Sequence, residues 1–353
     1  MGGGASKVAF PNRVGLDHFL VDRQVGQGGF GKVNAVELVR TKEQFAMKTL
    51  EKKKIKQSKN ISMINNERAI LSRLDKNSKW VCGMHYAFQN QENCYLVLTL
   101  ALGGDLRFHL NQTKDCRLKE SRVKFYTLCL VMALKECHDA GIIHRDIKPD
   151  NVVIKANGYC VLTDFGISKV MDENGTCTGS SGTRVYMPPE ALKKPHVQTK
   201  LADSYSLGVL VYELLEAKRS KNSKSLIQAD KVSSSINVDG KADLVDYDNL
   251  EVSDDGKSFL RSILLKDSSA RIGPEDMLKH AWFSDIDMKK FAAQELAAPW
   301  VPKPGEGYFE GDNKSDFSAA MGLGPPPKAQ VTPKDFDHGE FNGYDWNLTI
   351  AAN

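Results

Sequence analysis

Two short polar motifs, at residues 144–151 and 164–166, constrain this chain more than any other feature of its sequence. The first reads HRDIKPDN and the second DFG, and Asp164 follows Asn151 by thirteen residues. Phosphoryl transfer needs a carboxylate that orients a hydroxyl nucleophile and oxygen-bearing side chains that hold Mg²⁺ on ATP. Asp146 suits the first role, and Asn151 and Asp164 suit the second. Because this combination at this spacing is highly specific, it predicts a phosphoryl-transfer site with ATP and Mg²⁺ as cofactors.

Hydrophobic periodicity divides the chain into a β-rich first part and a helical second part. Strands are expected within 19–39, at 45–50 and at 94–100, and helices at 60–74, 120–140, 201–215 and 256–265. The predicted class is therefore α+β, with two lobes and one main helix in the small lobe. The expected divisions are a small lobe at 19–98, a hinge at 99–104 and a large lobe at 105–283.

The two ends of the chain differ from this core. Residues 1–18 form a glycine-rich leader that fits the pattern for N-myristoylation at Gly2, although a flexible leader would look the same. One myristoyl chain binds membrane only reversibly, and the lysines at 52–59 are either a second membrane signal or a solvated helix face. Residues 284–353, rich in Pro, Gly and acidic residues, are expected to be an extended tail.

Composition narrows the classes of protein. A net charge of +4 spread over 353 residues does not suggest a nucleic-acid binder. Seven scattered cysteines without a C-x-x-C pair indicate reduced thiols in the cytoplasm. No apolar run approaches the roughly 20 residues that span a bilayer. We expect a cytoplasmic monomer, partly membrane-associated if Gly2 is acylated.

A glycine-rich segment and a lysine–glutamate pair complete the expected nucleotide site. The segment GQGGFG also fits dinucleotide sites or a plain hairpin, but here the chain continues as a strand instead of entering a helix. Lys48 lies near the end of an apolar strand, and Glu67 follows nineteen residues later in a helix, which suits a phosphate-binding ion pair. The residues expected to contact the nucleotide here are Gly26, Gln27, Gly28, Gly29, Phe30, Gly31, Lys32, Val33 and Ala46.

Charged residues around Asp146 suggest supporting roles. Lys148 should neutralise charge on the transferred phosphoryl group. Arg145 lies beside the catalytic carboxylate, where a buried cation is costly without an anion. We therefore expect it to bind an anion, such as a phosphate on a nearby loop. Glu190, in the segment MPPE, resembles the end of a kinase activation segment, and this resemblance implies an ion pair with Arg271. Asp203 resembles the aspartate at a helix start that, in such sequences, braces the loop carrying the residue equivalent to Asp146.

These motifs, in this order over about residues 19–283, resemble eukaryotic protein kinases, and most closely the AGC group of Ser/Thr kinases. The segments NERAIL at 66–71 and GGDL at 103–106 are AGC-like. The resemblance implies further nucleotide contacts from Thr99, Ala101 and Asp105. The leader together with GGDLRFHL resembles, more weakly, the myristoylated YANK subgroup.

The tail carries a further part of the resemblance. FNGYDW at 341–346 matches the AGC hydrophobic motif except that Asp345 stands at the phosphorylated position, as a permanent partial phosphate substitute. The resemblance implies that Phe341 and Tyr344 dock on the small lobe, that Thr332 belongs to a turn motif, and that Phe317 reaches the nucleotide.

The activation loop departs from the AGC pattern. Gly179 replaces the usual threonine, so a phosphosite has shifted, for example to Thr178, or is absent. Arg145 and Lys169 would line the waiting pocket.

The leading hypothesis is an active Ser/Thr protein kinase. Asp105, Asp150 and Glu213 lie where basophilic AGC kinases carry acidic residues, so protein substrates with Arg or Lys upstream of the target are expected. A pseudokinase scaffold and a small-molecule kinase are the alternatives. The intact Lys48, Asp146 and Asp164 argue against the first, and the tail against the second.

Overall fold

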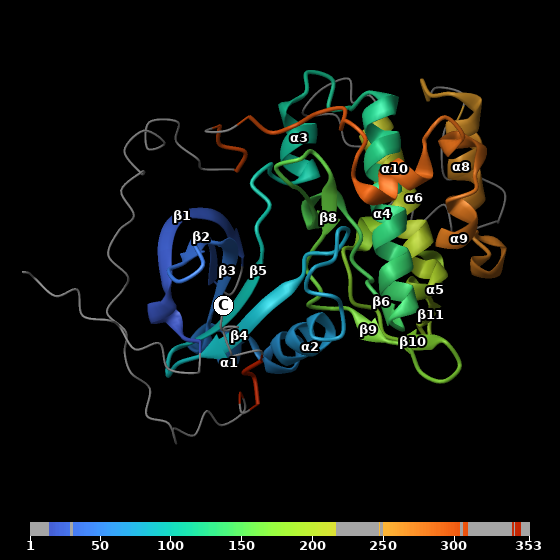
Figure 1. The fold of residues 1–353 in the computed structure, drawn as a ribbon. Helices are drawn as coiled ribbons and strands as arrows, with labels where there is room; N and C mark the ends of the chain where they lie inside the picture. The colour runs from blue at the N-terminus through green and yellow to red at the C-terminus, as the bar shows by residue number, and fades with distance from the viewer. Residues whose placement is uncertain are drawn as a thin grey trace, which may run out of the picture.

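The computed structural model describes residues 14–28, 31–216, 247, 250–303, 306–309, 341 and 343–346. They form a β-rich lobe followed by a mostly helical lobe (Figure 1). The predicted α+β, two-lobed class is confirmed.

The small lobe is built on a five-stranded antiparallel sheet in the order β1-β2-β3-β5-β4. Its strands are β1 (Phe19–Gly28), β2 (Gly31–Leu38), β3 (Gln44–Glu51), β4 (Met84–Gln89) and β5 (Asn93–Thr99). The sequence pattern did not predict β4, because a register shift between Met84 and Tyr86 interrupts the alternation of buried and exposed residues.

The register of the sheet places the nucleotide-site candidates on one face. Strand β3 lies between β2 and β5, so Lys48 pairs with Val33 on one side and with Leu96 on the other. Cross-strand partners share a face, and so do residues two apart along a strand. Val33, Lys48 and Ala46 therefore share a face. The opposite face packs a separate core that contains Met47, Phe45 and Val36.

Two helices, rather than the single one predicted, accompany this sheet: α1 (Lys52–Ser58) and α2 (Ile61–Leu71). Helix α2 buries Ile64, Glu67 and Ile70, so the carboxylate of Glu67 lies on the core-facing stripe of the helix. Helix α1 exposes most of its lysines, as a solvated helix face would, but Lys52 is buried.

The large lobe contains seven α-helices among the described residues. These are α3 (Leu106–Gln112), α4 (Glu120–Asp139), α5 (Pro189–Leu192), α6 (Leu201–Leu215), α8 (Asp254–Ile263), α9 (Pro274–Met277) and α10 (Met288–Ala293). Its strand pairs are β6 (Ile142–Ile143) with β9 (Lys169–Val170), β7 (Val152–Ile154) with β8 (Cys160–Leu162), and β10 (Thr176–Thr178) with β11 (Val197–Thr199). Single 3-10 turns occur at Leu16–His18, Pro149–Asn151, Arg184–Tyr186, Ser268–Ala270 and Ala281–Phe283.

Helices α4 and α6 form the centre of this lobe. Every residue of α6 after Leu201 is buried, including the charged Asp203 and Glu213, which have hydrogen-bond partners within the chain. All seven cysteines of the chain are buried and unpaired, which agrees with the expectation of reduced thiols. In the part of the chain that the structure describes, no helix combines the length and apolar character needed to cross a membrane.

The expectation that the chain is extended directly after Phe283 is wrong for residues 288–293. These residues form α10, whose Phe291 is fully buried. The Phe291 ring stacks on Trp80 at a centroid distance of 5.3 Å and meets Phe125 edge-on at 5.1 Å. One aromatic anchor therefore fixes this short segment onto the large lobe, which periodicity over six residues could not indicate.

Candidate active site

The predicted pair of Lys48 and Glu67 forms between the central strand and helix α2. The Lys48 Nζ lies 2.7 Å from Glu67 Oε1, and the Glu67 side chain is only 3% exposed. Burial alone would lower the pKa of Lys48, but the charges of Glu67 and Asp164 outweigh it and raise that pKa above its ordinary value. Lys48 is therefore held as a cation between two carboxylates that come from different elements.

Asp146 is the centre of a hydrogen-bond network on the loop before β7. Its Oδ2 accepts from Lys148 Nζ at 2.7 Å and from Asn151 Nδ2 at 3.0 Å. Its Oδ1 accepts from the Thr183 backbone N at 3.0 Å and from the Thr183 hydroxyl at 2.7 Å. Burial opposes ionisation, but the hydrogen bonds from Lys148 and Thr183 keep the pKa of Asp146 below its ordinary value. Asp146 is thus an ionised acceptor already bonded to a hydroxyl group.

Asp203, at the start of α6, holds the loop that carries Asp146 in place through hydrogen bonds. The fully buried Asp203 accepts from the backbone N of His144 at 2.9 Å and from that of Arg145 at 2.8 Å. It also contacts His138 Nε2 at 2.9 Å. Arg145 has a positive φ of 72°, a conformation that costs energy for a residue with a side chain. The hydrogen bonds from the His144 and Arg145 amides to Asp203 hold the backbone in this conformation. Asp203 therefore acts as the brace that the sequence predicts.

Asn151 and Asp164 supply the oxygen atoms suited to a metal. Asn151 donates from Nδ2 to Asp146, which orients its Oδ1 away from that carboxylate. Asp164 has a positive φ of 66° and lies close enough to Lys48 for its charge to raise the pKa of that lysine. Mg²⁺ commonly takes one or two protein oxygens and completes its shell with phosphate and water oxygens. The donor set fits such an ion, and no cluster of three or more His, Cys, Asp or Glu ligands occurs among the described residues.

The glycine-rich segment is a hairpin between β1 and β2. Gly26 pairs with Val33, Gln27 with Lys32, and Gly28 with Gly31, so the chain does continue as a strand. A Cβ at Gly31 would lie 1.7 Å from the carbonyl oxygen of Thr49, and no side chain fits there. Gly29 and Phe30 lie outside the described residues.

The hinge candidates join the two lobes. Thr99 ends β5, and its backbone N donates to Gly83 O at 2.9 Å. Ala101 follows in irregular chain and is half-buried. Asp105 caps α3 by accepting from Phe108 N at 2.7 Å. The Asp105 carboxylate therefore already accepts a hydrogen bond from the first turn of α3, in addition to any contact with a nucleotide.

Sequence reasoning missed a tail contact at the hinge. Gly104 has a positive φ of 74°, and a Cβ there would lie 2.3 Å from the carbonyl oxygen of Tyr308. The Tyr308 ring lies on His109, at a centroid distance of 5.9 Å. The pair Gly103-Gly104 could have signalled such close approach, but not which segment approaches.

The expected ion pair between Glu190 and Arg271 forms in the large lobe. Arg271 donates to both Glu190 oxygens, at 2.7 Å and 2.9 Å, from a fully buried side chain. It therefore links helix α5, which contains Glu190, to the segment between the 3-10 turn Ser268–Ala270 and α9.

Backbone carbonyls of the activation loop contact the two basic residues expected to line its phosphate pocket, Arg145 and Lys169. Arg145 Nη2 contacts Ser181 O at 3.4 Å, and Lys169 Nζ donates to Thr178 O at 2.7 Å. Gly179 lies against the Arg145 guanidinium, where a Cβ would approach Nη2 to 3.1 Å. Thr178 is exposed at the end of β10. Backbone carbonyls thus occupy part of the place where the sequence led us to expect a phosphate.

The tail motif docks on the small lobe. Phe341 is fully buried and Tyr344 is 1% exposed. Trp346 forms an antiparallel bridge with Ala87 of β4, and Arg68 of α2 donates to Gly343 O at 2.7 Å. Asp345 lies half-buried between these anchors. Thr332, Phe317 and Gly2 lie outside the described residues.

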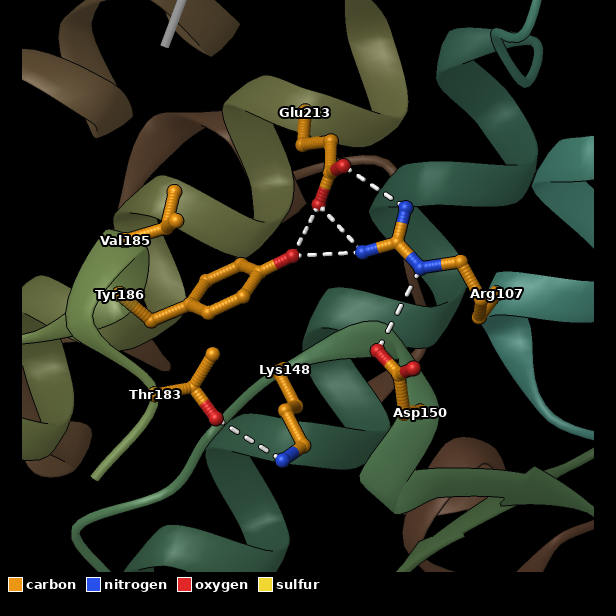
Figure 2. Close-up of a pocket in the computed structure, with 7 residues that line it drawn as sticks. All are labelled: Arg107, Lys148, Asp150, Thr183, Val185, Tyr186 and Glu213. Carbon is orange, nitrogen blue, oxygen red and sulfur yellow. Dashed lines mark hydrogen bonds and ion pairs between the residues drawn. The ribbon is translucent and has the colours of Figure 1, made fainter. Parts of the chain in front are cut away.

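Sequence reasoning also missed Arg107. The sequence led us to expect Asp150 and Glu213 to receive a substrate arginine, but an arginine of the chain itself contacts both (Figure 2). Arg107 and Glu213 are 106 residues apart, so no local signal could have predicted this pair.

Comparison with known proteins agrees with this geometry. The profile of the protein kinase domain matches residues 19–283. A Dictyostelium discoideum protein described as a probable serine/threonine-protein kinase is 32% identical over 84% of this chain and 63% of its own length. The serine/threonine-protein kinase SCH9 of Candida albicans is 35% identical, over 82% of this chain and 36% of its own length.

The serine/threonine-protein kinase AtPK2/AtPK19 of Arabidopsis thaliana is also 35% identical, over 82% of this chain and 59% of its own length. This chain therefore spans between about a third and two thirds of these relatives. The matched domain covers the Lys48–Glu67 pair, the Asp146 loop and Asp164. The chain belongs to the protein kinase family, in agreement with the AGC-type Ser/Thr kinases among its relatives.

Proposed function

We propose that this protein phosphorylates serine and threonine hydroxyl groups of other proteins, with ATP as the phosphoryl donor and Mg²⁺ as the metal. The observation that carries the proposal is the assembled site. The Lys48–Glu67 pair is closed at 2.7 Å while Asp146, Lys148 and Asn151 form one hydrogen-bond network. A scaffold that had lost transfer would not need both.

Each residue has a role that follows from its position. Bound Mg-ATP supplies the phosphoryl group and a charge-neutralised leaving group. Asp146, ionised and already accepting a threonine hydroxyl, can accept the hydrogen bond of a substrate hydroxyl and orient its oxygen. Lys148, 2.7 Å from Asp146, places a positive charge beside the oxygen that reacts. Lys48 is positioned by Glu67 to contact phosphate oxygens, and Asn151 and Asp164 to hold the metal.

The test is phosphoryl transfer to a degenerate serine and threonine peptide library with Mg-ATP. Wild type is compared with Asp164→Ala and Asp146→Asn. Asp139→Asn, on the exposed end of α4, is the matched control for removing a carboxylate. We expect transfer in wild type and control, and a loss of at least a thousandfold in both site variants. Folded wild type that binds Mg-ATP but transfers nothing would contradict the proposal and favour the scaffold alternative.

We also propose a cytoplasmic monomer that contacts membranes reversibly through a myristoylated Gly2 and does not bind nucleic acid. The M-G-x-x-x-[ST] pattern supports the acylation. The lysines of α1 are a weaker second signal than the sequence suggests, because Lys52 and Lys56 lie over the Phe341 ring, at 5.1 Å and 5.9 Å. Flotation of wild type and Gly2→Ala with vesicles, after expression with an N-myristoyltransferase, tests this. Equal flotation would contradict it.

A further inference from the structure

A pocket beside the catalytic loop contains an arginine of the chain itself. The pocket has a volume of about 350 Å³, and Lys148 and Thr183, both bonded to Asp146, form one wall. Arg107, Asp150 and Glu213 form the opposite part (Figure 2). A peptide whose hydroxyl reaches Asp146 would place a neighbouring side chain here.

The Arg107 guanidinium is held at the centre of this group. Its Nη1 lies 2.8 Å from Glu213 Oε1, and its Nη2 lies 3.1 Å from Glu213 Oε2. Nη2 also donates to the Tyr186 hydroxyl at 2.6 Å, and Nε lies 3.4 Å from Asp150 Oδ2. The Tyr186 hydroxyl in turn donates to Glu213. This two-point contact between guanidinium and carboxylate is the geometry that arginine recognition uses.

Burial makes this internal pair hard to displace. The Glu213 side chain is 9% exposed and that of Arg107 is 25% exposed. A substrate arginine could reach Glu213 only by removing Arg107, which would leave a partly buried cation without its anion. The third acidic candidate, Asp105, is bonded to the first turn of α3. All three carboxylates expected to bind a basic substrate therefore have partners within the chain.

Arg107 therefore reduces the negative charge that Asp150 and Glu213 would otherwise give the pocket. The lining contains two carboxylates, Asp150 and Glu213, which Arg107 contacts, and a second cation, Lys148, which is paired with Asp146. Asp150 is the weakest partner, because its side chain is 49% exposed and its contact with Arg107 is long. A substrate group that accepts hydrogen bonds can take its place on the exposed side of Arg107.

We propose that Arg107 determines substrate specificity by occupying the position of a substrate arginine, so that this site takes substrates with acidic or neutral hydrogen-bond acceptors, instead of basic residues, upstream of the target. The proposal rests on the protein kinase activity proposed above. It replaces the basic preference that the family resemblance implied.

The test uses three peptides that differ only at the positions two and three residues before the target serine. Both positions carry Arg in the first peptide, Gln in the second and Glu in the third. For wild type we expect kcat/KM with the Arg peptide no more than about twofold above that with Gln, and Glu at least equal to Gln. In Arg107→Met, Glu213 loses its internal cation, and we expect a tenfold or greater preference for Arg over Gln. The double variant Arg107→Met/Glu213→Gln should lose that preference again.

Two controls keep the outcome decisive. Arg117→Met removes an arginine from the exposed ion pair with Glu251 and should leave the selectivity of wild type unchanged. The same peptides with alanine at the target are measured by fluorescence anisotropy, which reports binding without transfer. The double variant also lacks Arg107 but has no uncompensated carboxylate at residue 213. Its stability therefore shows whether loss of the arginine alone, without an unpaired carboxylate, unfolds the protein.

A tenfold Arg preference in wild type, in transfer or in binding, would overturn the proposal and leave the kinase activity standing. An Arg107→Met variant with unchanged selectivity would also overturn it. Wild type that binds Glu and Gln peptides in preference to Arg but transfers nothing would support the specificity and refute the activity.

Discussion

Replacing Phe341 with alanine tests whether the docked tail motif supports the active site. The Phe341 ring is fully buried, with Lys52 Nζ over it at 5.1 Å. Its carbonyl accepts from Gln89 Nε2 at 2.9 Å, and two residues later the Gly343 carbonyl accepts from Arg68. Arg68 directly follows Glu67, so this contact connects the tail to the helix that positions Lys48.

The size of the effect follows from the burial. Truncating a buried phenylalanine to alanine costs about 3–5 kcal/mol in a core that cannot relax. The tail can leave its site, so we take about 3 kcal/mol, which weakens docking about a hundredfold. If the docked state is favoured about tenfold in wild type, it becomes disfavoured about tenfold in Phe341→Ala. The rate carried by docked molecules, and hence kcat, then falls about tenfold.

The assay pairs peptide phosphorylation with hydrogen exchange of the α2 amides. We expect kcat to fall about tenfold and α2 to exchange faster, with the melting temperature of the large lobe unchanged. Normal kcat with faster α2 exchange would refute the link from tail to site. Normal values of both would refute docking itself.

Tyr344→Phe is the matched variant, and its expected effect on tail docking is opposite to that of Phe341→Ala. The Tyr344 hydroxyl is buried and has no hydrogen-bond partner among the described residues, and burial raises its pKa well above the ordinary value. Removing an unsatisfied buried hydroxyl relieves a desolvation cost of about 1–3 kcal/mol. Tyr344→Phe should therefore keep or increase kcat and slow exchange in α2. A loss comparable to that of Phe341→Ala would show that the hydroxyl has a partner that the geometry does not provide.

Three further changes have defined outcomes. Glu67→Gln removes the negative charge that holds Lys48, and a charged hydrogen bond of this kind contributes about 1.5–3 kcal/mol. We therefore expect kcat/KM to fall by about tenfold or more. An unchanged kcat/KM would contradict the role of the pair. Arg271→Met leaves Glu190 partly buried without its cation and should lower the free energy of unfolding by about 3–5 kcal/mol in urea titrations, whereas a loss below about 1 kcal/mol shows that solvent compensates. Burial lowers the pKa of His109 from 6.5 to about 4, so the unfolded chain binds its proton first as the pH falls. Wild type should lose up to about 3 kcal/mol of stability between pH 6.5 and 4 that His109→Phe retains, and parallel pH profiles of the two proteins would contradict this assignment.

Local sequence was enough to predict the elements that carry the chemistry. Strand β3, helix α2 and the loop around Asp146 follow from periodicity and from side chains within a few residues of one another. The Lys48–Glu67 pair spans only nineteen residues, from strand β3 through the short helix α1 to α2, so short-range structure brings the two side chains together. Helix α6 agrees with its predicted range because its second half, 207–215, is apolar except for Glu213 and therefore favours a buried helix.

Contacts between distant segments were decided by the tertiary structure alone. The sequence by itself determined a two-lobed kinase with its reactive residues, because motif chemistry and periodicity are short-range properties. It did not show that α10 anchors the chain through Phe291, or that Tyr308 closes over Gly104. It placed Asp150 and Glu213 at the substrate side but could not show that Arg107 neutralises them. A carboxylate binds whichever cation the packing brings to it, and only the folded chain decides whether that cation belongs to the substrate or to the protein itself.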